Sequence, residues 1–330
     1  MFERTMNVFL YHFYLLKMSI KSLKKKLTNG FINCHAHIDR AGSIQFTNKE
    51  YIKRHLQEKW KLVNEVKRQL SQYNYYENIL SACLQQKEFD TKKIISFIDL
   101  DSTVYAKALY GAMRAKDELL QHDIELYIGN QTVGGFTKEN LKLFEDNVEY
   151  LDFLGGLPKS DDNPERHLDI LLSVAKSTGK KVHVHVDQLN VVEERETEWL
   201  AQKTIDYGLQ GKVVAVHSIS LACHPKIYRD YVYDLSKDAG LQFVCCPSAW
   251  IDHPRTERLS PTHNSMTPVD EMLERGLIVG IGTDNIEDVY KPYCNGDMMF
   301  ELRLALECNK IYDDDVLLDL AYNNGMKILE

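Results

Sequence analysis

The stretch FINCHAHIDRA, from Phe31 to Ala41, indicates both the fold and the chemistry of this chain. Side chains alternate between the two faces of a β-strand, so a regular strand here would place His35 and His37 on one face. The same alternation puts Phe31, Asn33 and Asp39 on that face, with Ile32, Cys34, Ala36 and Ile38 opposite. Two neutral imidazoles at this spacing can share a metal ion, although an isolated pair of histidines is more often structural.

Strand-like and helical segments alternate through the rest of the chain. After an amphipathic helical region at 48–86, we expect strands at 93–101, 124–131, 151–158, 181–187, 212–217, 241–246 and 277–283. Helical patterns follow these strands, and one of them begins at Asn163 and Pro164 and ends before Gly179. Eight strands over roughly 300 residues predict one α/β domain, a (β/α)8 TIM barrel. A doubly wound open sheet is the alternative, but its G-x-G-x-x-G pattern is missing after the first strand.

The composition is that of an ordinary globular protein. Of 330 residues, 44% are hydrophobic and 27% are charged, which argues against intrinsic disorder and allows a large core. The net charge of -8 argues against a nucleic-acid partner. Seven scattered cysteines show neither a disulfide framework nor a zinc knuckle, so a reducing cytoplasm is expected. We expect a small molecule as the partner, and the sequence leaves a homo-oligomer open.

Residues 1–29 are expected to be an extension ahead of a barrel at residues 30–330. The apolar run from Val8 to Leu16 is too short to span a bilayer, and no A-x-A cleavage site follows it. We interpret it as a helix that packs on the domain, or as sequence upstream of a second start at Met18. A cleaved signal or a membrane anchor is the less favoured alternative, and we expect no membrane partner.

Four side chains with metal-ligand character lie at the carboxyl ends of the predicted strands, where such a barrel builds its active site. His35 and His37 come from the first strand, His185 from the fifth, and Asp284 follows the eighth. Three imidazoles and a carboxylate suit one divalent ion, Zn²⁺ or Fe²⁺, with solvent in an open position. Such an ion lowers the pKa of bound water to about 7, so hydrolysis is the expected reaction class.

Other residues near these strand ends are candidates for proton transfer and substrate binding. His217, at the end of the sixth strand, could polarise the substrate or stabilise an oxyanion. Asp284 could take a proton from the water and return it to the leaving group. Gln131 and Gln188 could bind amide-like edges, because a primary amide both donates and accepts hydrogen bonds.

A further set of polar residues has structural interpretations beside functional ones. Asp99 and Asp101 either hold the histidines or cap the next helix, and the cap is favoured for Asp101. His183 lies one layer below His185 and is expected to be a core histidine. Lys159 follows the fourth strand, where a carbamylated lysine could bridge two metals, but we expect a solvated lysine and no second ion.

With these residues assembled, the chain resembles the amidohydrolase superfamily, and within it the cytosine deaminase-like branch, which includes triazine-ring hydrolases. The resemblance covers nearly all of residues 30–329, in the family's order of motifs: HAHID at 35–39, NQT at 130–132, GGLP at 155–158, HVDQ at 185–188, VHS at 216–218 and GTDN at 282–285. It implies that the metal ligands are His35, His37, His185 and Asp284. It also implies that His217 contacts the substrate or hydroxide and that Gln131 binds the substrate ring.

Three features depart from that family pattern. Deaminases of this branch carry a proton-shuttling glutamate at the position of Gln188, and an amide cannot transfer protons at neutral pH. The position of Asn285 often holds a second acid, so a changed substrate preference is expected there. The family's small β-sandwich is expected to be absent or vestigial, because the first barrel strand starts near residue 30 and the chain ends after its last helix.

The sequence therefore predicts a mononuclear metal hydrolase that acts on a C–N bond of a small cyclic or amide-bearing molecule. Asp284 and His217 would manage the protons, and Gln131, Gln188 and Asn285 would bind the substrate. The alternative is a catalytically silent barrel that keeps the pocket as a metal- or ligand-binding module. The presence of all four ligand residues favours the enzyme.

Overall fold

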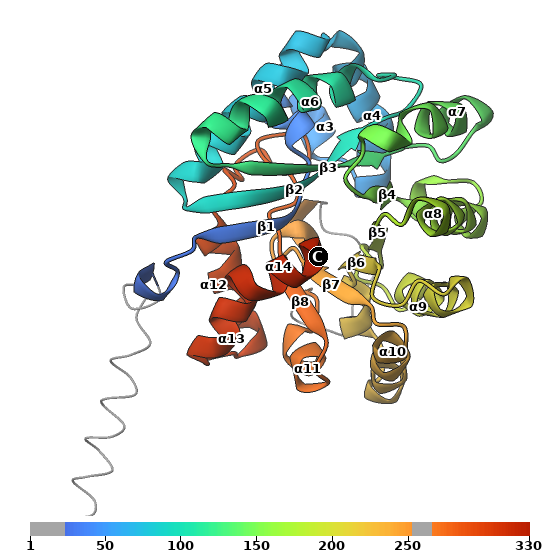
Figure 1. Cartoon of the computed structure of the whole chain (residues 1–330), viewed down its shortest axis with the longest axis vertical. Helices are drawn as coiled ribbons and strands as arrows, with labels where there is room; N and C mark the ends of the chain where they lie inside the picture. The colour runs from blue at the N-terminus through green and yellow to red at the C-terminus, as the bar shows by residue number, and fades with distance from the viewer. Residues whose placement is uncertain (1–23, 253–265) are drawn as a thin grey trace, which may run out of the picture.

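The computed structural model describes residues 24–252 and 266–330 (Figure 1). Within them, eight strands run in chain order: β1 (Phe31–Ala36), β2 (Thr91–Asp99), β3 (Glu125–Gln131), β4 (Leu154–Gly156), β5 (Val182–Val186), β6 (Val213–His217), β7 (Gln242–Cys245) and β8 (Ile278–Ile281). Strands β1 to β3 pair in order in one sheet and β4 to β8 in another, and every pairing is parallel. The predicted strands are confirmed, with ends that differ by a few residues.

Two single bridges join these sheets into the predicted (β/α)8 barrel. Gly129 on β3 pairs with Phe153, which directly precedes β4. Ala36 at the end of β1 pairs with Asp284 beyond β8, and the backbone N–H of Asp284 donates to the carbonyl oxygen of His35 at 3.0 Å. The first and last strands therefore meet at the residues from which the site is built.

Helices surround the strands on the outside of the barrel (Figure 1). In the described ranges they are α3 (Lys49–Ile52), α4 (Leu56–Gln69), α5 (Gln72–Glu88), α6 (Lys107–Leu119), α7 (Lys138–Asn147), α8 (Pro164–Thr178), α9 (Glu196–Tyr207), α10 (Lys226–Asp238), α11 (Val269–Glu274), α12 (Met298–Asn309), α13 (Asp314–Leu318) and α14 (Asn324–Leu329). The helical region predicted at 48–86 consists of three of them. The start and end predicted for α8 are confirmed, because Asn163 caps its first turn and Gly179 ends it with a φ of 73°.

A β-bulge in β1 breaks the regular alternation predicted for this strand. Asn33 pairs with Ile94 of β2, whereas Ala36 pairs with Ser96, so β1 holds one residue more than β2 between the two pairs. The backbone N–H of His35, inside the bulge, donates to the side-chain Oδ1 of Asn33 at 3.3 Å. Asn33 thus provides an acceptor where the ladder is interrupted.

The bulge changes which side chains face the barrel interior. Ile32 and Cys34 belong with Phe97 to a hydrophobic cluster formed by strands on opposite sides of the barrel. His35 also faces inward, with its ring centroid 5.0 Å from that of Phe97. Asn33 faces the helices, where its amide donates to a glutamine of α5 at 2.7 Å. The prediction that Asn33 shares a face with His35, opposite Ile32 and Cys34, is wrong, because the extra residue shifts the alternation by one.

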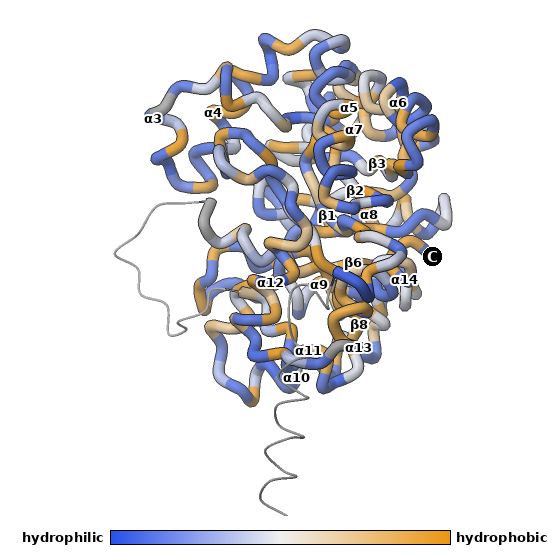
Figure 2. The backbone as a smooth tube through the Cα atoms, turned by 90° about the vertical axis from the view of Figure 1, so that its left-hand side faces the viewer, coloured by the Kyte–Doolittle hydropathy of each residue, from blue (hydrophilic) through white to orange (hydrophobic). Residues whose placement is uncertain are grey.

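The two ends of the barrel are covered by different helices. Figure 2 shows α3 and α4 on one side of the molecule and α14 on the other. Ile328 of α14 packs in the interior cluster with Ile32, and a Cβ at Gly325 would lie 2.8 Å from Ile32 Cβ. Helix α14 therefore closes the amino end of the strands, while Leu56 and Trp60 of α4 lie over the carboxyl end.

Some predictions concern residues beyond the described ranges. The extension predicted at 1–29 lies mostly outside them, as does part of the loop at 249–266. Every strand named above belongs to the barrel, so the described residues contain no separate β-sandwich. Among the helices of the described chain, none combines the length and the apolar character that crossing a bilayer would require.

Candidate functional site

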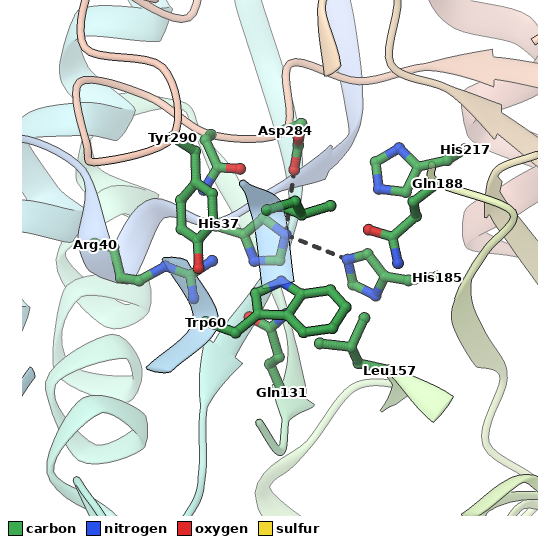
Figure 3. A pocket seen from close by; sticks show the side chains of 12 residues that line it. His37, Arg40, Trp60, Gln131, Leu157, His185, Gln188, His217, Asp284 and Tyr290 are labelled. Atoms are coloured by element: carbon green, nitrogen blue, oxygen red, sulfur yellow. Dashed lines mark hydrogen bonds and ion pairs between the residues drawn. The ribbon is translucent and has the colours of Figure 1, made fainter. Parts of the chain in front are cut away.

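Three histidines and an aspartate meet at the carboxyl end of the barrel (Figure 3). Asp284 Oδ1 lies 3.4 Å from His35 Nε2 and 3.3 Å from His37 Nε2. His185 Nε2 lies 3.3 Å from His37 Nε2. All four side chains are buried. The structure thus brings together the four residues predicted to bind a metal, and their role as ligands stays a prediction.

His217, the last residue of β6, extends this group of imidazoles. Its ring centroid lies 5.4 Å from those of His35 and His185. Two groups of three side chains each offer ligand atoms that lie within 4.8 Å of one another. One group is His35, His185 and His217, and the other is His35, His37 and Asp284. His35 belongs to both groups, so the two share one centre.

The backbone at two of these strand ends adopts the left-handed conformation. The φ angle is 79° at His217 and 61° at Asp284, a region that few residues other than glycine occupy. The hydroxyl of Thr267 donates to the carbonyl oxygen of His217 and fixes that turn. Gly282 permits the approach of β8 to β1, because a Cβ there would lie 2.7 Å from the carbonyl oxygen of His35. Local backbone geometry therefore aims both side chains into the barrel mouth (Figure 3).

Burial keeps these histidines neutral. Desolvation lowers the pKa of His35, lowers those of His37 and His185 well below the usual value, and lowers that of His217 to about 3. For His185, Nδ1–H donates to the carbonyl oxygen of Gly156 at 2.9 Å, which leaves the lone pair on Nε2, toward His37. Neutral imidazole is the form that binds a cation.

Asp284 is ionised at neutral pH. Burial alone would raise the pKa of its carboxyl group, but Lys291 and the neighbouring imidazoles outweigh burial and hold that pKa well below its usual value. Lys291 Nζ lies 3.8 Å from Asp284 Oδ2, and it donates to Ser248 Oγ at 3.1 Å and to the carbonyl oxygen of Thr283 at 2.5 Å. One oxygen of Asp284 therefore faces the histidines and the other faces a fixed cation.

This donor set fits a single divalent cation. His35 Nδ1 makes no hydrogen bond to any described residue and Nε2 has only the 3.4 Å approach to Asp284 Oδ1, although the side chain is fully buried. Unpartnered buried polar atoms cost free energy, which binding of a cation would recover. A cation would also explain why His37 and His185 direct their Nε2 atoms at each other. Nitrogen and carboxylate donors suit Zn²⁺ or Fe²⁺.

The cluster opens into a pocket that holds roughly 300 Å³ of space free of protein atoms, part of it open to solvent. Its lining residues are His37, Arg40, Leu56, Trp60, Gln131, Leu157, His185, Gln188, His217, Asp284, Asn285 and Tyr290. Figure 3 shows His185, His217 and Gln188 on one side of His37 and Arg40 on the other. The pocket thus has a histidine-rich side and a side that carries a guanidinium.

The three predicted substrate-binding residues all line this pocket. Gln131 Oε1 and Gln188 Nε2 are buried and make no hydrogen bond within residues 24–252 and 266–330. The amide of Asn285 donates to Asp288 Oδ2 at 2.6 Å, so its carbonyl oxygen is the group left for a ligand. The pocket therefore presents hydrogen-bond acceptors as well as a donor.

Asp99 and Asp101 do not hold the histidines. Lys67 Nζ lies 3.0 Å from Asp99 Oδ2 and 3.1 Å from Asp101 Oδ2, with all three side chains buried. Asp101 Oδ1 accepts from the backbone N–H of Thr103 at 2.8 Å. Asp101 therefore caps a turn ahead of α6, which begins at Lys107, and the expectation that it caps the helix is wrong.

Lys159 and His183 lie outside the cluster, as expected. Lys159 is not simply solvated, because its Nζ lies 3.2 Å from carboxylate oxygens of both Glu194 and Glu196. His183 is buried in the core against Phe153, with ring centroids 4.4 Å apart.

Sequence reasoning missed Arg40, Trp60, Tyr290 and Lys291. Arg40 lies within the stretch that carries the histidines, and Tyr290 and Lys291 lie in the loop after the eighth strand, so their positions at the carboxyl end of the barrel were an available signal. Trp60 gave no such signal, because an amphipathic pattern does not show that α4 lies over the barrel mouth.

Comparisons with known proteins agree with this geometry. No family model matches the chain. The chain is 38% identical over 272 residues to an uncharacterized protein of Haemophilus influenzae, covering 78% of this chain and 98% of that protein. It is 26% identical over 335 residues to N-isopropylammelide isopropyl amidohydrolase of Pseudomonas, covering 95% of this chain and 77% of that protein. Its fold matches 5-methylcytosine deaminase of Klebsiella pneumoniae with a TM-score of 0.81 at 22% identity, covering 91% and 75% of the two chains.

The structural likeness identifies the barrel, and the sequence likeness to an amidohydrolase extends over nearly the whole chain. Both agree with the histidine and aspartate cluster at the end of the strands. In sequence and fold the chain is therefore similar to hydrolases of the amidohydrolase superfamily, among them an amidohydrolase and a cytosine deaminase that act on carbon–nitrogen bonds.

Proposed function

We propose that this hydrolase breaks a C–N bond in a small cyclic or amide-bearing molecule with the help of one divalent metal ion. The observation that carries the proposal is the buried convergence of neutral His35, His37 and His185 on ionised Asp284. Relatives named as an amidohydrolase and a deaminase support hydrolysis at a carbon–nitrogen bond.

The four converging residues would hold Zn²⁺ or Fe²⁺. When bound there, the ion supplies hydroxide at neutral pH, because it lowers the pKa of a bound water to about 7. The protein contributes a buried site whose imidazoles are already neutral, so no proton has to leave His35, His37 or His185 before binding.

His217 would act on the substrate. Its pKa of about 3, caused by burial, keeps the imidazole neutral, and Nδ1 makes no hydrogen bond to the described part of the chain. A neutral imidazole in this position can donate N–H to the oxygen or ring nitrogen on which charge develops. His217 therefore stabilises the transition state without itself becoming an acid.

Asp284 would carry the proton. An ionised carboxylate beside the histidines can accept a proton from the attacking water and return it to the leaving amine. Gln188 occupies the position of the family's glutamate and offers hydrogen bonds only. Proton transfer therefore falls to Asp284, with Lys291 holding its second oxygen.

The pocket walls support a planar substrate of modest size. Trp60 and Leu157 provide apolar surface beside the histidines, while Gln131 and Gln188 provide polar groups (Figure 3). Apolar walls with a few polar groups are typical of sites for small molecules, and an indole ring stacks well on a heterocycle. A nitrogen heterocycle with amide-like edges fits this combination.

Metal analysis tests the proposal directly. Elemental analysis of the purified wild type should find close to one equivalent of zinc or iron per chain. The double variant His35→Ala, His37→Ala should lose it, and His122→Ala, outside the site, should keep it. The metal-loaded wild type should then release ammonia or an amine from members of a panel of aminopyrimidines, aminotriazines and small cyclic amides.

Two negative results have different meanings. No stoichiometric metal in the wild type, even after anaerobic reconstitution, would exclude the hydrolytic mechanism. Metal binding with ligand-induced thermal stabilisation but no turnover would instead identify a binding module, the function that the glutamine at position 188 favours as second candidate.

We further propose that the enzyme works in the cytoplasm. None of the seven cysteines, all of which lie in the described ranges, forms a disulfide, and five of them are buried: Cys34, Cys83, Cys223, Cys245 and Cys246. Cysteines kept out of disulfides are typical of a reducing compartment. Fractionation of the source cells, followed by immunoblotting, tests this localisation.

A further inference from the structure

Arg40 is the cationic side chain that lines the pocket. It ends a 3-10 turn, η1 (Ile38–Arg40), that directly follows His37. The side chain is only 4% exposed. Figure 3 shows its guanidinium reaching toward the pocket on the side of His37 away from His185 and His217. The charge therefore faces the part of a bound ligand that is remote from the histidines.

The contacts of Arg40 leave at least one of its donors without a partner in the described ranges. Nη1 lies 3.4 Å from Asp99 Oδ1, a long contact, while the other carboxylate oxygen of Asp99 has Lys67 at 3.0 Å. The guanidinium lies 5.4 Å from the centre of the Tyr290 ring. Nε is buried and makes no hydrogen bond to a residue in the described ranges. A buried donor without a partner is costly, and the guanidinium lines the pocket, where a ligand atom can pair with its N–H groups.

The charged groups around Arg40 indicate what kind of ligand atom would accept its hydrogen bond. Although burial opposes the charge on Arg40, the carboxylates of Asp99, Asp39 and Asp288 keep its pKa raised, so it is always a donor. These carboxylates would also repel a full negative charge on a ligand. A neutral carbonyl oxygen meets both conditions.

Gln131 adds a complementary group. Its Oε1 is a buried acceptor without a hydrogen bond in the described chain, and it lines the same pocket as Arg40. An acceptor and a donor together match the N–H and C=O of a cyclic amide.

We propose that Arg40 determines specificity by donating a guanidinium N–H to an exocyclic oxygen of the substrate ring, at an edge remote from the C–N bond that is hydrolysed. This inference rests on the proposed function and narrows its substrate class to oxo-substituted nitrogen heterocycles. Arg40 touches the substrate and not the reacting atoms, so its contribution is to binding.

Binding of reaction products tests this role without turnover. Titration calorimetry on zinc-loaded protein would compare pairs of rings in which the second member has one more exocyclic oxygen: 4-pyrimidinone with uracil and hypoxanthine with xanthine, where the oxygen replaces hydrogen, and ammeline with ammelide, where it replaces an amino group. The variants are Arg40→Met, Arg40→Lys and, as the matched control, Arg54→Met, whose side chain is 55% exposed.

The wild type should bind the oxygen-rich member of at least one pair more tightly. Arg40→Met should weaken the binding of that member by about 10- to 100-fold, because a hydrogen bond to a charged group is lost. The affinity for the other member of the pair should not change. Arg40→Lys should retain part of the preference, and Arg54→Met all of it. Arg40→Lys keeps the charge beside Asp99 and so tests the proposal even if Arg40→Met does not fold.

Two results would overturn the inference in distinguishable ways. Rings that bind without preference for the extra oxygen, or an equal loss for both members in Arg40→Met, would show that Arg40 is only structural while the proposed function stands. Failure of the zinc-loaded wild type to bind any ring of the panel would remove the heterocyclic substrate class, and with it this role of Arg40.

Discussion

His37 and Asp284 contact each other twice. The side-chain atoms His37 Nε2 and Asp284 Oδ1 lie 3.3 Å apart, and the backbone N–H of His37 donates to the carbonyl oxygen of Asp284 at 3.2 Å. The same two residues therefore join the first strand to the last and bring two candidate metal ligands together. Closure of the barrel and assembly of the cluster are one structural event, so a barrel open at this seam would lack the site.

Stability in acid should depend on His217. Its pKa is about 3 in the folded chain and about 6.5 when unfolded, so between these values the unfolded state binds more protons. The contribution of neutral His217 is complete above pH ~6.5 and is lost as the pH falls toward ~3. In metal-depleted protein, His217→Gln should therefore reduce the slope of unfolding free energy against pH by up to about 1.4 kcal/mol per unit in this window.

Urea unfolding of both proteins at several pH values measures this difference. Buried acids such as Asp39 and Glu301, whose pKa is raised to about 7 by burial, titrate with the opposite sign. They are present in both proteins and cancel in the comparison. Equal slopes for wild type and variant would contradict the assignment of a strongly lowered pKa to His217.

The same substitution should have a separate effect on catalysis. His217→Gln is expected to reduce kcat by about 10²- to 10³-fold, the usual loss when a donor to a developing charge is removed. Metal content should stay near that of the wild type, because His217 is not among the four proposed ligands. Steady-state kinetics with parallel metal analysis separates the roles, and a variant that loses its metal would make His217 a ligand.

Gln188→Glu should add a proton shuttle. Glutamate at this position can transfer protons to a ring nitrogen and a leaving amine, and general acid–base catalysis contributes roughly 10²- to 10⁴-fold. We expect deamination of aminopyrimidines to rise within that range, measured as ammonia release. Turnover of cytosine by the wild type at ordinary enzyme rates would show that the amide is no obstacle.

Lys67 should be essential for the attachment of α4. Lys67→Met leaves Asp99 and Asp101 buried without their ammonium partner, a change that typically costs about 3–5 kcal/mol. Lys53→Met, on a pair whose side chains are 71% and 64% exposed, is the control and should change stability by less than about 0.5 kcal/mol. Similar unfolding free energies for the two variants would mean that the buried contacts of Lys67 with Asp99 and Asp101 contribute no net stability.

Asn33 should be required for the position of His35. Its Oδ1 accepts from the backbone N–H groups of His35 and Thr283 at 3.3 and 3.1 Å, and Asn33→Ala leaves both unpaired. Each costs about 1–3 kcal/mol if it stays buried, and the variant should also bind metal less completely. The control is Cys34→Ala, at the neighbouring residue in the hydrophobic cluster inside the barrel, and this variant should keep its metal. Elemental analysis compares the metal content of the two variants.

The periodicity of hydrophobic residues was enough to predict the barrel, because each strand and helix carries its own local pattern. The four candidate ligands could be predicted because active sites of such barrels lie at the carboxyl ends of the strands. The bulge did not follow, because it depends on the register between β1 and β2. The pairing of Lys67 with Asp99 and the position of Trp60 depend on how α4 packs, which no local pattern encodes. Arg40 was visible in the sequence, but its unused donor is a property of the packed pocket.

The extra residue in β1 also bears on how such a site can evolve. In a strand without it, His35 and His37 could face inward only if Ile32 and Cys34 faced outward, so each half of the strand would constrain the other. With the extra residue, the hydrophobic positions at Ile32 and Cys34 can be substituted while His35 and His37 still face the barrel interior. Selection for stability and selection for a new substrate can therefore act on the same strand without conflict.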